Sequence, residues 1–357
     1  MERCTRSSPN GVDSRRALRK ERPFLYARSV PLRVGVLGAG FAGAMHAHSA
    51  MGLDDVQVVA IAALPLDQGA ALAQECGARL ATAEQICAAD DIDLVVVATP
   101  THLHAEYATA AAKAGKHVFC EKPIARTREQ AEEMVRACDA AGVTLAVGHV
   151  VRYFPEYQRA KQLLDDGTLG RPAIATLVRG NFSVGSAREW YLDSAKSGGV
   201  VLDLMLHDLD TVRWWFGEPS RVYARRFTGR AGLEYALATI RYDDRPIVHI
   251  EGSWAEHAGF RTGFELRGDR GMLVHDSRAT SPLTVQSPAG PAGPAMMATP
   301  TLAESPYRRQ LRDLFARIGR GERPLVDGHE GLRSLALGLA VIESADSGNV
   351  IEWKAPA

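Results

Sequence analysis

Three short motifs in this chain carry the residue types of a redox active site. A glycine-rich turn, Gly38–Gly43, follows an apolar run, and Glu121-Lys122-Pro123 follows another. Asp203 and His207 lie beyond the pair Gly198-Gly199. A glycine turn of this kind can hold a pyrophosphate, and Lys, Asp and His side chains can exchange a proton with a hydroxyl group. Together the motifs predict a nicotinamide-dependent oxidoreductase.

The glycine turn stands between a predicted strand and a predicted helix, which is the context that dinucleotide binding requires. Gly38, Gly40 and Gly43 form the pattern Gly-x-Gly-x-x-Gly. These glycines allow a tight turn, a close approach of the backbone to pyrophosphate, and close packing of the helix on the strand. We therefore expect the turn, with Phe41 and Ala42 inside it, to bind the cofactor.

The end of the second predicted strand leaves the choice between NAD and NADP open. Ala63 stands where an acidic residue usually binds the ribose hydroxyls. No Lys or Arg occurs between Leu53 and Ala78 to bind a 2′-phosphate. Because an unpaired phosphate is the costlier group to bury, the sequence favours NAD slightly over NADP.

Lys122 follows the apolar run His117–Cys120, so we expect it at the carboxyl end of a parallel strand, where ligands of such sheets bind. A lysine there can exchange a proton with a substrate hydroxyl if burial or neighbouring charge lowers its pKa. The alternative is a surface lysine in an ion pair with Glu121. The sequence leaves both interpretations open.

Asp203 and His207 are four residues apart in a segment of helical period, which places their Cβ atoms about 5–6 Å apart on one face. The carboxylate would favour the charged imidazole, and the imidazole would meet a hydroxyl proton. A simple contact on the helix surface is an alternative, and so is a metal site that adds Asp210. No metal is expected, because no Cys/His cluster accompanies these residues.

Apolar runs alternate with helical patterns from Leu32 to Tyr153, as a doubly wound parallel sheet requires. The predicted strands are Leu32–Leu37, Val56–Ala62, Leu94–Ala98, His117–Cys120 and Thr144–Gly148. The predicted helices are Gly43–Met51, Asp67–Cys76, Ala105–Ala114 and Arg128–Ala141. These elements make the first part of the chain an α/β domain with the motif residues at one edge of its sheet.

The pattern changes after Phe154 to strands with short turns, which indicates a C-terminal α+β domain with a mostly antiparallel open sheet. The predicted strands are Ala173–Arg179, Arg221–Phe227, Tyr235–Tyr242, Ile247–Ser253 and a returning Val350–Trp353. The predicted helices are Glu156–Asp165, Gly199–Phe216, Pro306–Ile318 and Gly331–Ser344. Residues 281–300, rich in Pro, Gly and Ala, are predicted to form a loop.

The composition fits a two-domain protein that binds a small molecule. The chain has 357 residues and a formal net charge of zero, so neither nucleic acid nor an anionic membrane is an expected partner. Five scattered cysteines without paired spacing suggest reduced thiols and a cytoplasmic protein. Residues 1–31 are expected to form a disordered basic arm, because charged residues interrupt the apolar stretch that an export signal would need.

With these motifs, the chain resembles the glucose-fructose oxidoreductase / inositol dehydrogenase / rhizopine catabolism family (Gfo/Idh/MocA). The resemblance extends from Leu32 to the C-terminus. It rests on Gly38–His46, Ala98–His104, Ala114–Pro123 and Ser197–Asp210. It implies a Rossmann domain over residues 32–153, and a substrate-binding domain over residues 154–357 whose open sheet joins a homodimer or homotetramer.

The resemblance also implies roles for particular residues. Lys122, Asp203 and His207 would surround the reacting carbinol, Thr99 and Pro100 would line the nicotinamide side, and Pro123 would follow a cis peptide bond. Further cofactor contacts are expected from His104 and Glu121. Further substrate contacts are expected from His149, Arg152, Tyr153 and Trp190.

The predicted activity is the reversible oxidation of a secondary alcohol on a sugar or cyclitol with NAD or NADP. One alternative is a non-redox sugar enzyme with a retained, transiently reduced NAD. Another is a catalytically silent ligand-binding regulator of the same fold. The substrate stays open, although Arg152, Arg179 and Arg188 could contact an acidic or phosphorylated sugar.

Overall fold

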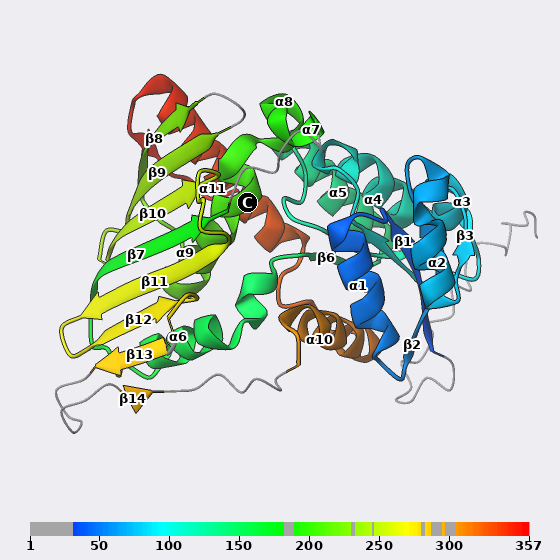
Figure 1. Cartoon of the computed structure of the whole chain (residues 1–357), viewed down its shortest axis with the longest axis horizontal. Coiled ribbons are helices and arrows are strands. Elements are labelled where there is room, and N and C mark those ends of the chain that lie inside the picture. Colours follow the sequence, from blue (N-terminus) through cyan, green and yellow to red (C-terminus); the bar gives the residue numbers. More distant parts are fainter. Residues whose placement is uncertain are drawn as a thin grey trace, which may run out of the picture.

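The computed structural model describes residues 31–181, 189–229, 233–244, 246–279, 283–286, 295–296 and 304–356. Two sheets organise these residues (Figure 1). The predicted basic arm, apart from residue 31, lies outside the described residues, as do Arg188 and most of the predicted loop over residues 281–300.

The first sheet is parallel throughout and has the strand order β3-β2-β1-β4-β5-β6. Its strands are β1 (Leu32–Leu37), β2 (Val56–Ala62), β3 (Arg79–Leu80), β4 (Leu94–Val97), β5 (His117–Cys120) and β6 (Leu145–Val147). The order of connection reverses between β1 and β4, and ligands of such sheets bind at that switch point, beyond the carboxyl ends of the strands. The predicted parallel α/β fold is confirmed.

Helices cover both faces of the first sheet. They are α1 (Phe41–Met51), α2 (Ala70–Cys76), α3 (Ala83–Ala88), α4 (His104–Lys113) and α5 (Arg128–Ala141), with 3₁₀ turns η1 (Leu66–Gly69) and η2 (Thr101–Leu103). One face also packs against α10 (Pro306–Arg320), which lies far along the chain. Leu311, Leu314 and Phe315 of α10 join the core that contains β1 and α1, so the C-terminal part of the chain helps to build the first layer.

The second sheet has the order β14-β13-β12-β11-β7-β10-β9-β8-β15, and its strand pairs are antiparallel except for β7 and β10. The predicted open, mostly antiparallel sheet is therefore confirmed, including the returning terminal strand. The strands are β7 (Pro172–Gly180), β8 (Arg221–Thr228), β9 (Glu234–Arg241), β10 (Ile247–Ser253), β11 (Arg261–Gly268), β12 (Met272–Asp276), β13 (Leu283–Gln286), β14 (Ala295–Met296) and β15 (Ile351–Glu352).

Helices α6 (Pro155–Asp165), α9 (Leu206–Phe216) and α11 (Gly328–Ser347) lie on one face of the second sheet, and the other face is open (Figure 1). Side chains alternate accordingly along β8, where Val222 and Ala224 are buried while Tyr223 and Phe227 are exposed. The remaining short helices are η3 (Val150–Tyr153), α7 (Glu189–Leu192), α8 (Ser194–Ser197) and the π-helical turn η4 (Val201–Met205).

The segment that carries Asp203 and His207 differs from the single α-helix predicted over Gly199–Phe216. A π-helical turn, η4, comes first and runs directly into α9. Because a π-turn spaces its hydrogen bonds one residue further apart than an α-turn, it changes where Asp203 points relative to His207. Such turns occur frequently at functional sites.

Candidate active site

A cavity of about 1260 Å³ runs along the carboxyl ends of β1, β2, β4 and β5 and reaches η4 and α9 beside the second sheet. The glycine turn lines one part of it, and Lys122, Asp203 and His207 line another. The switch point of the first sheet and the three predicted catalytic residues therefore share one cavity.

The backbone of the glycine turn fits the pyrophosphate of a dinucleotide. Gly38 has a φ of +107°, and a Cβ there would lie 2.3 Å from the Ala98 carbonyl oxygen. Gly43 packs under Gly38, where a Cβ would lie 1.7 Å from the Gly38 oxygen. A Cβ on Gly40, in contrast, would meet no atom within 4 Å, because Gly40 faces the cavity. No side chain caps the first amides of α1, so they stay available to an anion.

Most of the predicted cofactor residues line this cavity. They are Gly38, Gly40, Phe41, Ala42, Ala63, Thr99, Pro100, His104, Glu121 and Lys122. Gly43 does not line it but supports the turn from below. Both ring nitrogens of buried His104 face backbone carbonyl oxygens, with Nδ1 2.8 Å from Pro123 and Nε2 2.9 Å from Thr99. His104 therefore joins the two segments predicted to border the nicotinamide.

Glu121 is held by His46, from the helix after the glycine turn, and not by the side chain of Lys122. Its Oε1 lies 2.6 Å from Nε2 of His46, and its Oε2 accepts a hydrogen bond of 2.9 Å from the backbone amide of Lys122. Burial raises the pKa of Glu121, but the hydrogen bond and charge of His46 outweigh it and leave this pKa lowered. Glu121 therefore stays ionised and fixes the backbone at Lys122.

Lys122 makes its ion pair with Asp203. Its Nζ donates to the Asp203 carbonyl oxygen at 2.6 Å and to Oδ1 of the same residue at 3.2 Å. The Lys122-Pro123 peptide bond is cis, as the resemblance implies. Burial lowers the pKa of Lys122, but the nearby charges, led by Asp203, outweigh it and raise this pKa. Lys122 is therefore a charged hydrogen-bond donor, and the lowered pKa that a proton-accepting lysine needs is absent.

The expectation that Asp203 favours the charged form of His207 is wrong. Asp203 uses its carboxylate on Lys122 and on Nε1 of Trp254, which donates to Oδ2 at 3.2 Å. Burial holds the pKa of His207 well below its usual value, and the charges of Lys122 and Arg179 lower it further. The Asp203 carboxylate does not offset this lowering of the His207 pKa, because it is engaged with Lys122 and Trp254. His207 is therefore a neutral imidazole at the cavity wall.

The predicted substrate residues divide into two groups. Trp190 lines the cavity, together with Asp203 and His207. His149, Arg152 and Tyr153 do not, and the Tyr153 hydroxyl group instead donates to Asp313 at 2.8 Å. These three residues support the site from behind the cavity wall.

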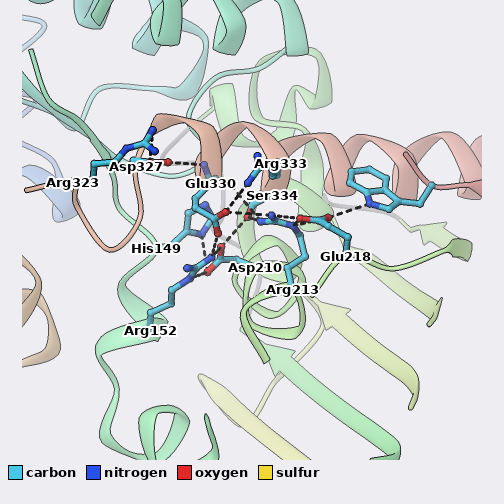
Figure 2. A network of polar contacts seen from close by, with 11 residues as sticks. His149, Arg152, Asp210, Arg213, Glu218, Arg323, Asp327, Glu330, Arg333 and Ser334 are labelled. Atoms are coloured by element: carbon cyan, nitrogen blue, oxygen red, sulfur yellow. Dashed lines mark hydrogen bonds and ion pairs between the residues drawn. The ribbon is translucent and has the colours of Figure 1, made fainter. Parts of the chain in front are cut away.

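Arg152 belongs to a buried polar network that joins η3, α9 and α11 (Figure 2). Its guanidinium donates to both carboxylate oxygens of Asp210, at 2.9 and 2.7 Å, and to Glu330 at 2.8 Å. Ser334 donates to Asp210 at 2.8 Å, and it accepts from Arg213 at the same distance. The metal site considered with Asp210 does not form in this geometry, because Asp210 is fully committed to this network.

Arg179 does line the cavity, but its charge is already compensated. Its guanidinium donates to both oxygens of buried Asp208, at 2.8 and 2.9 Å, and to the Tyr157 hydroxyl group at 3.3 Å. Neither Arg152 nor Arg179 is therefore free to neutralise an acidic or phosphorylated sugar. Arg188, the third candidate, lies outside the described residues.

Several cavity residues were not predicted from the sequence. They are Gln68, Thr82, Glu84, Asn181, Tyr191, Phe260 and Tyr307. They come from segments that are far apart along the chain, and only the tertiary fold brings them to one cavity. Trp254 carried a weak signal, since it directly follows the predicted strand Ile247–Ser253.

No group of three or more His, Cys, Asp or Glu side chains in the described part of the chain could hold a metal ion. The described helices also include none that is both long enough and apolar enough to cross a membrane.

The fold and the site define a dinucleotide-binding oxidoreductase, and family models agree. Residues 32–149 match the Gfo/Idh/MocA model described as an oxidoreductase family with an NAD-binding Rossmann fold, and residues 157–274 match the C-terminal domain model of the same family. The chain belongs to the Gfo/Idh/MocA family.

Characterised relatives cover nearly the whole chain. A 1,5-anhydro-D-fructose reductase from Ensifer adhaerens is 30% identical over 336 residues, which is 90% of this chain and 98% of the relative. A myo-inositol 2-dehydrogenase from Thermotoga maritima is 26% identical over 328 residues, which is 88% of this chain and 96% of the relative. A solved levoglucosan dehydrogenase in complex with NADH and levoglucosan is 25% identical, has a TM-score of 0.84, and covers 91% of this chain and 99% of its own.

Proposed function

We propose that this protein transfers a hydride between a nicotinamide cofactor and a secondary alcohol or ketone of a sugar or cyclitol. The observation that carries this proposal is the Lys122–Asp203 ion pair beside neutral His207, in the same cavity as the glycine turn. The named activities of the relatives, which act on anhydro-fructose, inositol and levoglucosan, support this substrate class.

The residues of the glycine turn, Thr99, Pro100 and His104 would hold the cofactor, whose nicotinamide accepts or gives the hydride when it is bound. Gly40 leaves room for the pyrophosphate, and the first amides of α1 would donate hydrogen bonds to it. His104 lies between Thr99 and the Lys122-Pro123 segment, close to a backbone oxygen of each. The cofactor and the reacting carbon would thus meet between two backbone segments that share a buried histidine.

Neutral His207 would take the proton from the substrate hydroxyl during oxidation, since its lowered pKa leaves it unprotonated at neutral pH. Charged Lys122 would hydrogen-bond the same oxygen and stabilise the developing alkoxide. Asp203 keeps Lys122 charged and in place and is itself held by Trp254. Trp190, at the cavity wall, would pack against the sugar ring.

Two alternative functions are a catalytically silent regulator and a non-redox sugar enzyme with a retained NAD. Both predict no net reduction of added NAD. The purified protein should therefore be mixed with NAD or NADP and a panel of inositols, aldoses, uronic acids and sugar phosphates, and the absorbance of the reduced nicotinamide followed. Reduction with a neutral sugar or cyclitol is the expected result. No reduction with any compound, despite measurable cofactor binding, would contradict the proposed dehydrogenase.

We also propose a cytoplasmic homodimer or homotetramer that assembles through the open face of the second sheet. Large apolar side chains are exposed along strands β7, β8 and β9: Ile174, Tyr223, Phe227, Tyr235 and Leu237. A patch of this kind favours burial against another protein surface. Light scattering of the purified protein should give a multiple of the 38.6 kDa chain mass, and a monomer would contradict the proposed assembly.

A further inference from the structure

The part of the cavity beside the end of β2 is where a dinucleotide places its adenosine, because the ribose meets the residue after the second strand in this fold. Three segments border it: the glycine turn, the residues after β2, and the first turn of α3. The side chains that line it are Phe41, Ala63, Leu64, Leu66, Gln68, Thr82, Ala83 and Glu84.

The glycine turn presents an apolar side chain here, and the residues after β2 are apolar except for Gln68. Phe41 is 64% exposed and Leu64 is 85% exposed, which is unusual for large apolar side chains on a cavity wall. Such surfaces suit the flat faces of an adenine ring. Ala63 occupies the usual place of the ribose-binding acid, so the hydroxyl groups of the ribose need another polar partner, and the third segment offers a carboxylate.

Glu84 is the one charged side chain among the described residues that line this part of the cavity. The neighbouring Thr82 side chain lowers the pKa of Glu84, so this exposed carboxyl group is ionised at neutral pH. Thr82 caps α3 in a capping box with Gln85, which fixes the turn that carries Glu84. The turn therefore presents the Glu84 side chain at the cavity wall.

No described cation is available there to bind a 2′-phosphate. Arg79 of β3 lies near in sequence, but its guanidinium donates to both oxygens of Asp91, at 2.7 and 2.8 Å, and it does not line the cavity. A phosphate at the ribose would therefore face an anion without a compensating charge.

We propose that Glu84 accepts hydrogen bonds from the ribose hydroxyls of NAD and repels the 2′-phosphate of NADP, so that this chain prefers NAD. The inference rests on the proposed function and assigns its cofactor. A carboxylate can accept a bond from each hydroxyl of the diol, whereas next to a phosphate it faces like charge. An acid on the first turn of α3 thus takes over the task of the missing acid after β2.

The test is direct binding of NADH and NADPH to the full chain, measured by energy transfer from tryptophan to the reduced nicotinamide and by calorimetry. We expect wild-type protein to bind NADH at least about tenfold more tightly than NADPH. Glu84→Gln should bring the two dissociation constants within about threefold of each other, because it removes the repelling charge and weakens the diol contact. Glu84→Lys should reverse the preference.

Glu106→Gln is the matched control, since Glu106, like Glu84, is an exposed residue in the first turn of a helix, but it does not line the cavity. It should keep the wild-type ratio. Equal affinities in the wild-type protein, or an unchanged ratio in Glu84→Gln, would overturn the inference. Binding of neither nucleotide would instead overturn the proposed function, so the two failures are distinguishable.

Discussion

The two ends of the cavity are built in different ways. At the nucleotide end, backbone groups and small residues form the wall of the cavity. Gly40 leaves open space, and no side chain caps the first amides of α1. At the catalytic end, charged side chains come from distant segments and hold one another, as Lys122 and Asp203 do. The geometry of the nucleotide end therefore depends on the backbone of one local turn. The geometry of the catalytic end depends on ion pairs between residues that are far apart along the chain.

This comparison predicts that damage at the two ends has different consequences. Substitutions behind the catalytic end should destabilise the fold, because buried charges lose their partners. Substitutions at the nucleotide end should mainly change binding, because they fill open space.

The largest expected effect is on stability, in the network behind the catalytic end. Asp210→Asn leaves the Arg152 guanidinium without its buried carboxylate, so the free energy of unfolding should fall by about 3–5 kcal/mol. Asp165→Asn, which removes an exposed ion pair with Lys161, should cost less than about 1 kcal/mol. Urea denaturation of both variants measures the difference, and similar losses would show that the Asp210 network contributes little.

Next in size is the loss of catalysis without loss of binding. Lys122→Met should lower turnover by about two orders of magnitude or more, because the alkoxide loses its charged donor, while NADH affinity stays within about twofold. Lys113→Met, at the exposed end of α4, should match the wild-type protein in both respects. Steady-state kinetics measure the turnover of both variants, and nucleotide titration measures their NADH affinity. Turnover like that of the wild type would remove Lys122 from the mechanism.

A smaller effect is expected at the nucleotide end. Gly40→Ala points a methyl group into the cavity, so NADH binding should weaken by about tenfold or more while the unfolding midpoint changes little. Gly319→Ala, in the last turn of α10 where a Cβ also meets no atom within 4 Å, should leave binding unchanged and raise stability by less than about 1 kcal/mol. Calorimetry and thermal unfolding distinguish the two variants; tight NADH binding by Gly40→Ala would contradict the assigned pyrophosphate position.

The smallest effect is a dependence of stability on pH. Burial lowers the pKa of both His149 and His207, so the folded state binds fewer protons than the unfolded state below about pH 6.5. Their contribution to stability is complete above about pH 6.5 and is lost as the pH falls, by up to about 1.4 kcal/mol per pH unit for each histidine. Unfolding at several pH values should show a shallower slope for His149→Phe than for the wild-type protein. Equal slopes would contradict this prediction.

Much of the fold was predictable because the pattern of the first sheet is local. Strands β1, β2 and β5 and helix α5 have the bounds predicted from apolar runs and helical period. The short strand β3, with both residues exposed, has no apolar signal and was missed. The π-turn η4 was missed as well, because a shift of one hydrogen-bond position leaves the helical pattern of the sequence almost unchanged.

The catalytic residue types were predictable, but their partners were not. The spacing of Asp203 and His207 suggested a carboxylate–imidazole pair, whereas the structure pairs Asp203 with Lys122 and Trp254. Lys122 lies just after β5 and Trp254 directly after β10, so only the packing of the two sheets brings them to Asp203. The charge states of Lys122 and His207 depend on this packing too.

By itself, the sequence determined the glycine turn, the parallel sheet that presents it, and the identities of Lys122, Asp203 and His207. Those features depend on neighbours within a turn or a strand, where residue type decides backbone geometry. Only the tertiary structure decided that Lys122 pairs with Asp203 and stays charged, that the pKa of His207 is lowered, and that Glu84 lines the same cavity as the glycine turn. Charge and burial act through space, and the residues that set them are far apart along the chain.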